Sequence, residues 1–119
     1  MSISSMHAQK FYEDVAHNLK VFTIKDNSGY PAPKTPDGKR AQPFWSSKSR
    51  AEKIIENVPA YKMFTVVEIS WNEFKEEWVP DLTKEKLLVG INWSGKGAKG
   101  YDLEPKNVVK NVEYWQSKE

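Results

Sequence analysis

Residues 43–50 read Pro-Phe-Trp-Ser-Ser-Lys-Ser-Arg and mark a change from strand to helix. Aromatic residues are typical of strands, whereas a run of serines is typical of helix caps. Further on, apolar residues recur at helical spacing, at Ala51, Ile54, Ile55 and Val58. The stretch therefore predicts a strand that enters a helix. Ser49 and Glu52 fit a capping box, with Ser46 or Ser47 as alternative caps.

The chain before this stretch alternates between periodic segments and turns. An apolar stripe predicts a first helix, about Ser5 to Asn18, and a β-branched run predicts a strand at residues 21–24. A short extended segment, residues 30–34, lies between two predicted turns. Its two prolines remove amide donors from one side, so we expect it at the edge of a sheet. Residues 39–45 form the next predicted strand.

The same periodicities continue after the second helix. They predict a strand at residues 63–69, a short helix from Ser70 that Pro80 ends, a strand at residues 87–93, an extended segment at residues 101–103 and a last helix from Pro105. The short helix presents Trp71, Phe74 and Trp78 on one face. We expect this face to pack against the sheet together with Ile54 and Ile55.

These elements predict an α+β fold. Strands joined by short turns favour antiparallel pairing, and interleaved helices can cover such a sheet. We therefore expect a single compact domain over residues 1–119, with a mainly antiparallel or mixed sheet of four to six short strands and four helices packed on it. A chain of 119 residues with a 39% hydrophobic share is large enough for a core of its own.

Composition excludes several classes of protein. The formal net charge of +2 is too small to imply nucleic-acid binding unless basic residues cluster locally. The absence of cysteine excludes disulfides, thiol nucleophiles and Cys-ligated metals. No apolar run is long enough to span a membrane and no signal peptide is recognisable, so we expect a cytoplasmic protein. The histidines, His7 and His17, lie about 15 Å apart along the first helix, so we expect no shared metal ion.

Several segments, spread over nearly the whole chain, form specific motifs: Gly38-Lys39-Arg40-Ala41, Pro43-Phe44-Trp45-Ser46-Ser47, Ser49-Arg50-Ala51-Glu52-Lys53-Ile54-Ile55, Val58-Pro59-Ala60-Tyr61, Glu68-Ile69-Ser70-Trp71, Leu87-Leu88-Val89-Gly90-Ile91-Asn92-Trp93-Ser94-Gly95-Lys96 and Gly100-Tyr101-Asp102-Leu103-Glu104-Pro105. These motifs resemble a family of small bacterial proteins known as domain of unknown function 2750. The resemblance implies a bacterial, single-domain protein and implies no activity, cofactor or catalytic residues. Two positions depart from the family's pattern, since glycine is common where Lys86 stands and arginine where Gly97 stands.

The predicted start of the second helix is the main candidate for a ligand site. The chain has two arginines, which flank this segment, and a helix N-terminus with nearby cations can bind an anion. Arginine suits this role because its planar guanidinium can bind two oxygens at once. The candidate residues are Arg40, Trp45, Ser46, Ser47, Ser49 and Arg50. In the alternative interpretation Trp45 belongs to the core, the serines only cap the helix and the arginines are solvated.

A second candidate, polar and aromatic, lies where two predicted strands end. It consists of Asn92, Trp93, Lys96, Tyr101 and Asp102. The alternative role of Asn92 and Asp102 is to hold the loop between them by hydrogen bonds to its backbone. Residues 90–96 match the spacing G-x-x-x-x-G-K. The Ser or Thr and the helix that a phosphate-binding loop needs do not follow, so we expect no nucleotide cofactor.

The sequence predicts no reaction. We expect a bacterial cytoplasmic binding or interaction module whose ligand is another protein or a small anionic group, with the oligomeric state left open. An enzyme of unknown activity and a weak nucleic-acid binder are the alternatives. An enzyme would need a pocket in which titratable groups converge, and a nucleic-acid binder would lose affinity steeply as salt is added.

Overall fold

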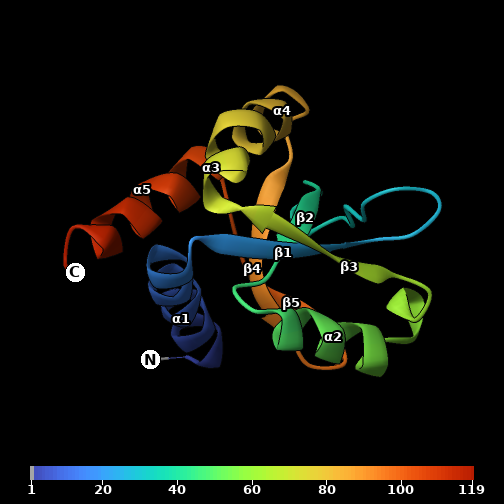
Figure 1. The fold of residues 1–119 in the computed structure, drawn as a ribbon. Coiled ribbons are helices and arrows are strands. Elements are labelled where there is room, and N and C mark those ends of the chain that lie inside the picture. The colour runs from blue at the N-terminus through green and yellow to red at the C-terminus, as the bar shows by residue number, and fades with distance from the viewer. Residues whose placement is uncertain (1) are drawn as a thin grey trace.

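A computed structural model describes residues 2–119 and shows helices and strands interleaved along the chain (Figure 1). In chain order the elements are α1 (Ile3–Asn18), β1 (Lys20–Lys25), β2 (Ala41–Phe44), α2 (Lys48–Asn57), the 3₁₀ helix η1 (Pro59–Tyr61), β3 (Thr65–Ser70), α3 (Trp71–Glu73), the π-helical segment η2 (Phe74–Trp78), α4 (Val79–Lys84), β4 (Leu88–Ser94), β5 (Lys99–Leu103) and α5 (Pro105–Gln116). None of these helices combines the length and the apolar character that crossing a bilayer requires.

The strands form two sheets that meet at a seam. β1 pairs with β3 in antiparallel orientation, while β4 lies between the parallel β2 and the antiparallel β5. Phe22 of β1 and Trp45, the residue after β2, join the two sheets. Each of their backbone N–H groups donates to the carbonyl of the other, at 2.8 and 2.7 Å. The strand order across the seam is therefore β3-β1-β2-β4-β5.

Pro43 limits the pairing between β1 and β2 at this seam. Proline has no backbone N–H to donate to a neighbouring strand. Its carbonyl accepts a hydrogen bond from Oγ1 of Thr23 at 2.8 Å, and Thr23 is fully buried. Nε2 of Gln42 lies 3.4 Å from the same Oγ1. A threonine side chain thus replaces a backbone partner where the ladder is interrupted.

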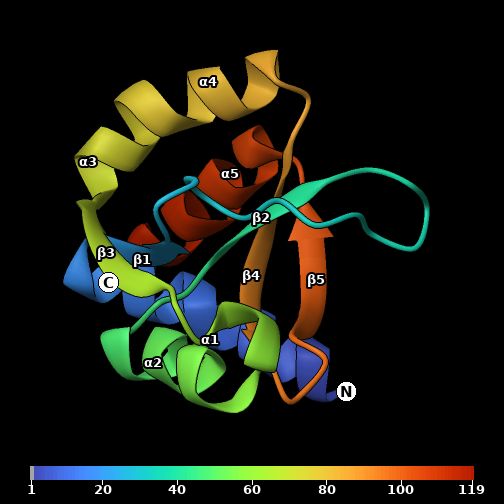
Figure 2. The ribbon, with the colours of Figure 1, turned by 90° about the vertical axis from the view of Figure 1, so that its right-hand side faces the viewer.

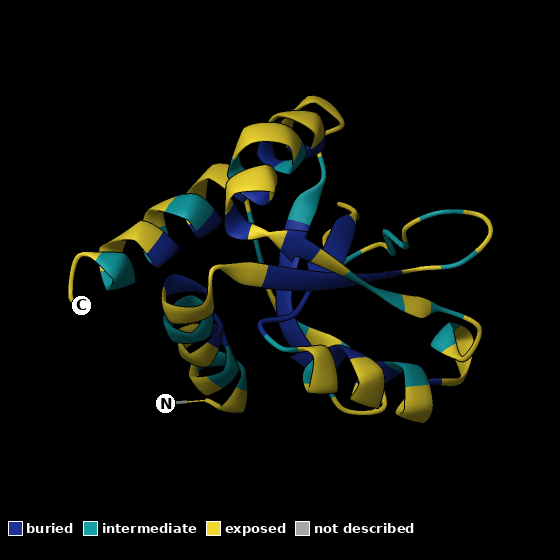
Figure 3. Ribbon diagram, viewed as in Figure 1, coloured by how far each residue is buried: buried dark blue, intermediate teal, exposed yellow. Residues whose placement is uncertain are grey.

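Helices cover both faces of the strands, and each face has its own hydrophobic core (Figures 1 and 2). Successive residues of a strand point to opposite faces, and Val21 and Phe22 of β1 accordingly belong to different cores. The first core contains side chains of α1, the α3–α4 segment and α5, and the second contains side chains of α2. The central strands are therefore buried, as Figure 3 shows, while β3 and β5 at the edges are more exposed.

The helix that begins after Ser70 continues past Pro80, so the expectation that Pro80 ends it is wrong. Ser70 caps the helix by accepting a hydrogen bond from the Glu73 amide at 3.1 Å. The chain then widens into a π-helical turn, in which the amide of Val79 donates to the carbonyl of Phe74, five residues earlier. A proline in a regular helix clashes with the carbonyl four residues before it. The wider turn accommodates Pro80, and α4 continues to Lys84.

The other expectations for the fold have mixed outcomes. The α+β class is confirmed, with one parallel strand pair in an otherwise antiparallel arrangement. Residues 30–34 are extended but form no strand of either sheet; Pro33 and Lys34 pair along one side only, with Ala41 at the start of β2 and with Arg40 before it. The aromatic face of α3 and η2 lies in the first core, whereas Ile54 lies in the second, so these two apolar stripes do not pack together.

Phe74 tests the first core. It is fully buried, stacks on Trp71 with ring centroids 5.4 Å apart and meets Phe44 edge-on at 5.1 Å. We expect Phe74→Ala to lower the free energy of unfolding by about 3–5 kcal/mol, measured by urea denaturation. The matched control is Glu76→Ala on the exposed side of the same segment, with an expected change below about 0.5 kcal/mol. Equal effects of the two changes would contradict this description of the core.

Candidate functional site

A bulge in β4 sets the geometry of the candidate site. Asn92 adopts a positive φ of 47°, and the pairing of β4 with β5 changes register between Ile91 and Ser94. Asparagine tolerates this left-handed conformation better than most residues. In a regular strand, residues two apart point to the same face, so Trp93 would point into the first core as Ile91 does. The bulge turns Trp93 to the face of the second core, where it packs with Trp45.

The side chain of Asn92 connects three parts of the chain. Its Oδ1 accepts a hydrogen bond from the Ser46 amide at 2.9 Å, and its Nδ2 donates to the His7 carbonyl at 3.0 Å and to Ser46 Oγ at 3.1 Å. Ser46 Oγ in turn donates to Asp14 at 2.8 Å. Asn92 and Ser46 are only 1% and 2% exposed. Because buried polar groups are costly unless hydrogen-bonded, this network fixes α1, the β2–α2 junction and β4 in one arrangement.

Two glycines make room for the indole ring of Trp93. A Cβ atom on Gly90 would lie 2.3 Å from Trp93 Cε2, and one on Gly100 would lie 2.9 Å from Trp93 Cδ1. The indole Nε1–H donates to Asp102 Oδ1 at 2.8 Å. The Trp93 carbonyl accepts a hydrogen bond from Trp45 Nε1, also at 2.8 Å. Close packing and two hydrogen bonds therefore hold Trp93 in place.

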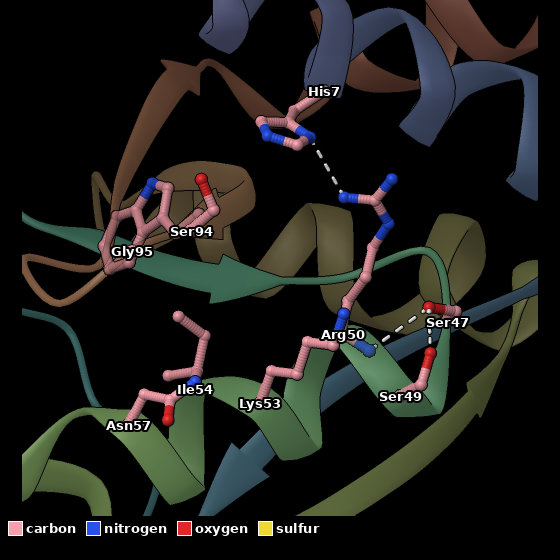
Figure 4. A pocket seen from close by; sticks show the side chains of 10 residues that line it. His7, Ser47, Ser49, Arg50, Lys53, Ile54, Asn57, Ser94 and Gly95 are labelled. Atoms are coloured by element: carbon pink, nitrogen blue, oxygen red, sulfur yellow. Dashed lines mark hydrogen bonds between the residues drawn. The ribbon is translucent and has the colours of Figure 1, made fainter.

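A hollow of about 440 Å³ opens beside this network, between α1, α2 and the start of the β4–β5 hairpin (Figure 4). Its lining residues are His7, Ser47, Ser49, Arg50, Lys53, Ile54, Asn57, Trp93, Ser94 and Gly95. No Asp or Glu is found among the described residues that line it, so the charges of Arg50 and Lys53 are not neutralised there. The hollow is therefore cationic at neutral pH.

Arg50 reaches from α2 toward His7 on α1 (Figure 4). Its Nη1 lies 3.1 Å from Nδ1 of His7, and since arginine can only donate, Nδ1 is the acceptor of this bond. Ser47 caps α2 by accepting a hydrogen bond from the Arg50 amide at 3.3 Å. Within residues 2–119 no carboxylate forms an ion pair with Arg50. The guanidinium thus retains N–H donors for a ligand.

Half of the main candidates from the sequence line this hollow: Ser47, Ser49 and Arg50. Ser46 lies behind it, in the buried network of Asn92. Trp45 is fully buried in the second core and does not line the hollow. Arg40 lies before β2, whereas Arg50 follows its far end, and the Arg40 guanidinium donates to the carbonyl of Ala32 at 2.9 Å. The structure therefore separates the two arginines.

The secondary candidates also divide. Trp93 lines the hollow, and Asn92 is buried beside it. Lys96 is exposed in the turn of the β4–β5 hairpin. The hydroxyl of Tyr101 forms a hydrogen bond with a serine of α1. Asp102 lines a neighbouring hollow rather than this one. Trp93 and Asn92 thus connect the two sets of candidates, Trp93 by lining the hollow and Asn92 through its hydrogen bonds to Ser46.

Sequence reasoning missed His7, Lys53 and Asn57. A signal was present for the last two, because Lys53 and Asn57 follow Arg50 at three and seven residues and such positions share a face of a helix. No local signal points to His7, which reaches the site from a helix far away in the sequence. Within residues 2–119 no three His, Asp or Glu side chains converge as a metal site would require.

Sequence comparison identifies the family. The family described as "Protein of unknown function (DUF2750)" matches residues 8–112. The chain belongs to this family. Lys86, one of the two positions that we expect to depart from the family's pattern, adopts a positive φ of 58°. Glycine takes this conformation without the steric cost that a lysine bears.

Comparison beyond the DUF2750 family adds no functional assignment. No curated protein matches the sequence significantly. A solved structure described as "Anabaena Tic22 (protein transport)" is similar with a TM-score of 0.41 and 12% sequence identity, over 70% of this chain and 45% of that chain. The chain thus spans less than half the length of that structure. A similarity at this level carries no conclusion about function.

Asn92→Ala tests the network. The change leaves the Ser46 amide and the His7 carbonyl without their partner and places alanine in a left-handed conformation, so we expect a loss of about 2–4 kcal/mol in unfolding free energy. Asn92→Gly loses the same hydrogen bonds as Asn92→Ala but adopts the left-handed conformation without a steric cost. It should still be less stable than the wild type. Asn107→Ala, at an exposed position of α5, should change stability by less than about 0.5 kcal/mol. A fully stable Asn92→Ala protein would show that the network is not needed for the fold.

Asp102 gives a prediction for pH. Burial raises the pKa of its carboxyl, against the opposing hydrogen bond from Trp93, and the charge of Asp37 adds to the increase. The stability from the neutral acid is present below the unfolded pKa, about 3.9, and is lost as pH rises through the folded pKa. Asparagine keeps the acceptor for Trp93 without the charge. The melting temperature of Asp102→Asn relative to wild type should therefore rise over that pH window and then level off; a difference independent of pH would contradict this.

Proposed function

We propose that the protein is a binding module that receives a small anionic group, a carboxylate or a phosphate, in the hollow lined by His7, Arg50 and Lys53. The observation that carries this proposal is the cationic lining without an opposing carboxylate among the described residues. We also propose that the protein is bacterial and cytoplasmic, with one domain over residues 1–119.

The chemistry of the lining suits an anion. Arg50 is half-buried, and a charge that is partly withdrawn from water interacts more strongly with an opposite charge than a fully exposed one. Lys53 adds a second positive charge from the same face of α2, and Ser49 and Ser94 add hydroxyl donors. Planar guanidinium groups bind carboxylate and phosphate oxygens in pairs. The amino end of α2 contributes a further favourable potential for an anion.

The site is also prepared before a ligand arrives. Asn92 fixes α1 against the β2–α2 junction through the contacts described above, and His7 holds the Arg50 guanidinium at the hollow. Groups that are already oriented lose less conformational entropy on binding. The free protein therefore supports anion binding without a rearrangement of its backbone.

Arg50→Gln tests the proposal, with Arg40→Gln as the matched arginine control outside the hollow. In a ¹⁵N NMR titration with sodium sulfate at constant ionic strength, Arg50→Gln should weaken binding by about tenfold, which corresponds to about 1.4 kcal/mol. Arg40→Gln should leave the affinity unchanged. Arg50→Gln should alter the unfolding free energy by less than about 1 kcal/mol, since it breaks no ion pair.

Two results would contradict the anion site. Equal weakening in both variants would show that sulfate responds to the overall charge and not to the hollow. Chemical-shift changes that spare the amides of residues 47–53 and 93–95 would place the anion elsewhere. The constant ionic strength matters because salt screens exposed charges over a Debye length of about 10 Å at 0.1 M.

A further inference from the structure

A second hollow adjoins the proposed anion site. It measures about 540 Å³ and lies against η1 and the β4–β5 hairpin. Trp93 lines both hollows. Asn57, the last residue of α2, lines the first hollow, and the next residue, Val58, lines the second. In the β4–β5 hairpin, likewise, Gly95 lines the first hollow and Gly97 lines the second. The two hollows therefore adjoin each other at Trp93, between helix and hairpin, and we call this pair of hollows the groove.

The second hollow differs from the first in chemistry. Its lining is predominantly apolar and includes proline, aromatic and aliphatic residues: Pro33, Pro36, Val58, Ala60, Tyr61, Trp93 and Ala98. Lys34 and Lys99 contribute exposed cationic side chains, and Asp102 contributes the carboxylate. Hollows of this kind accept an apolar group and orient it through a few polar contacts.

Asp102 distinguishes between possible apolar ligands. Within residues 2–119 its carboxylate receives one side-chain hydrogen bond, from Trp93 Nε1 to Oδ1, so Oδ2 can accept another. Burial raises the pKa of this carboxyl, in line with a carboxylate that lacks full hydration. A hydrocarbon chain brings no donor to Oδ2, and leaving a part-buried acceptor unpaired costs free energy. A peptide brings backbone N–H groups that satisfy it.

We propose that the groove binds the carboxy terminus of a peptide whose last residue is apolar, with the terminal carboxylate at Arg50 and Lys53, the last side chain in the second hollow and a backbone N–H on Asp102. This inference rests on the proposed anion site and adds the class of its ligand. Capture of a terminal carboxylate by cations and backbone donors is a known mode of peptide recognition. The groove presents cations first and a hydrogen-bond acceptor next. A peptide presents its terminal carboxylate and then its backbone N–H in the same order.

The test uses acetylated tripeptides that end in Leu, Phe or Val, each as the free acid and as the C-terminal amide. Hexanoate and sulfate serve as comparison ligands. Binding is followed by NMR through the indole Nε1–H signal of Trp93, because this group contacts Asp102 and its ring lines both hollows. We expect at least one free acid to bind about tenfold more tightly than its amide, than hexanoate and than the same tripeptide ending in Asp.

Two variants separate the two ends of the groove. Arg50→Gln should remove the preference for the free acid over the amide. Asp102→Asn presents a donor where an acceptor was, so it should weaken the peptide about tenfold and should not weaken hexanoate, which makes no hydrogen bond to Oδ2. Arg40→Gln is the control that should change neither ligand.

The outcomes distinguish the inference from the proposed function. If sulfate and hexanoate bind as tightly as the peptides, and Asp102→Asn has no effect, the peptide inference is overturned while the anion site remains. If no peptide acid shifts the Trp93 signal at millimolar concentration, the inference is overturned, and the sulfate titration then decides the anion site. If amides bind as well as acids, the carboxylate is not recognised and the inference is likewise overturned.

Discussion

The left-handed conformation of Asn92 is the constraint on which the rest of this site depends. A single residue with a φ of 47° interrupts β4, and two consequences follow from it. The strand beyond it changes face, which brings Trp93 into the second core, and the Asn92 carboxamide is left at the point where α1, β2 and α2 meet. Its Oδ1 accepts one hydrogen bond and its Nδ2 donates two, all to groups of the protein. A buried asparagine held by three hydrogen bonds specifies one arrangement of its neighbours.

The two cores explain why a hollow exists between well-packed elements. α1 belongs to the first core and α2 to the second, so their apolar faces do not meet. Polar side chains fill the interval instead: Ser46 and Asn92 in the interior, then His7 and Arg50 nearer to the solvent. Since the interval is bridged by hydrogen bonds and not by apolar packing, it can be solvated on its outer side. A cationic hollow at such a boundary is accessible to a ligand without disrupting either core.

Local patterns predicted the elements well and the contacts between them poorly. Helical spacing located α2, and the serine run included its actual cap, Ser47. Pro80 was misjudged because the rule that proline ends a helix does not allow for a π-helical turn before the proline, such as the one at Phe74–Trp78. The site itself depends on long-range contacts. Trp45 and Trp93 each precede a serine and both lie in the second core, and nothing local shows that only Trp93 also lines the hollow. The asparagine before Trp93 was the available signal, because asparagine favours the left-handed region.

The central claim is that the Asn92 network holds the β2–α2 junction rigid in the free protein, and amide hydrogen exchange of Ser46 tests it most directly. The Ser46 N–H donates to a side chain and not to a strand partner, so its protection reports this one contact. The account predicts that this amide exchanges as slowly as the amides of the central strand β4, such as that of Ile91. Exchange as fast as that of Gly97 in the exposed hairpin turn would show that the junction opens freely, and would contradict a prepared site.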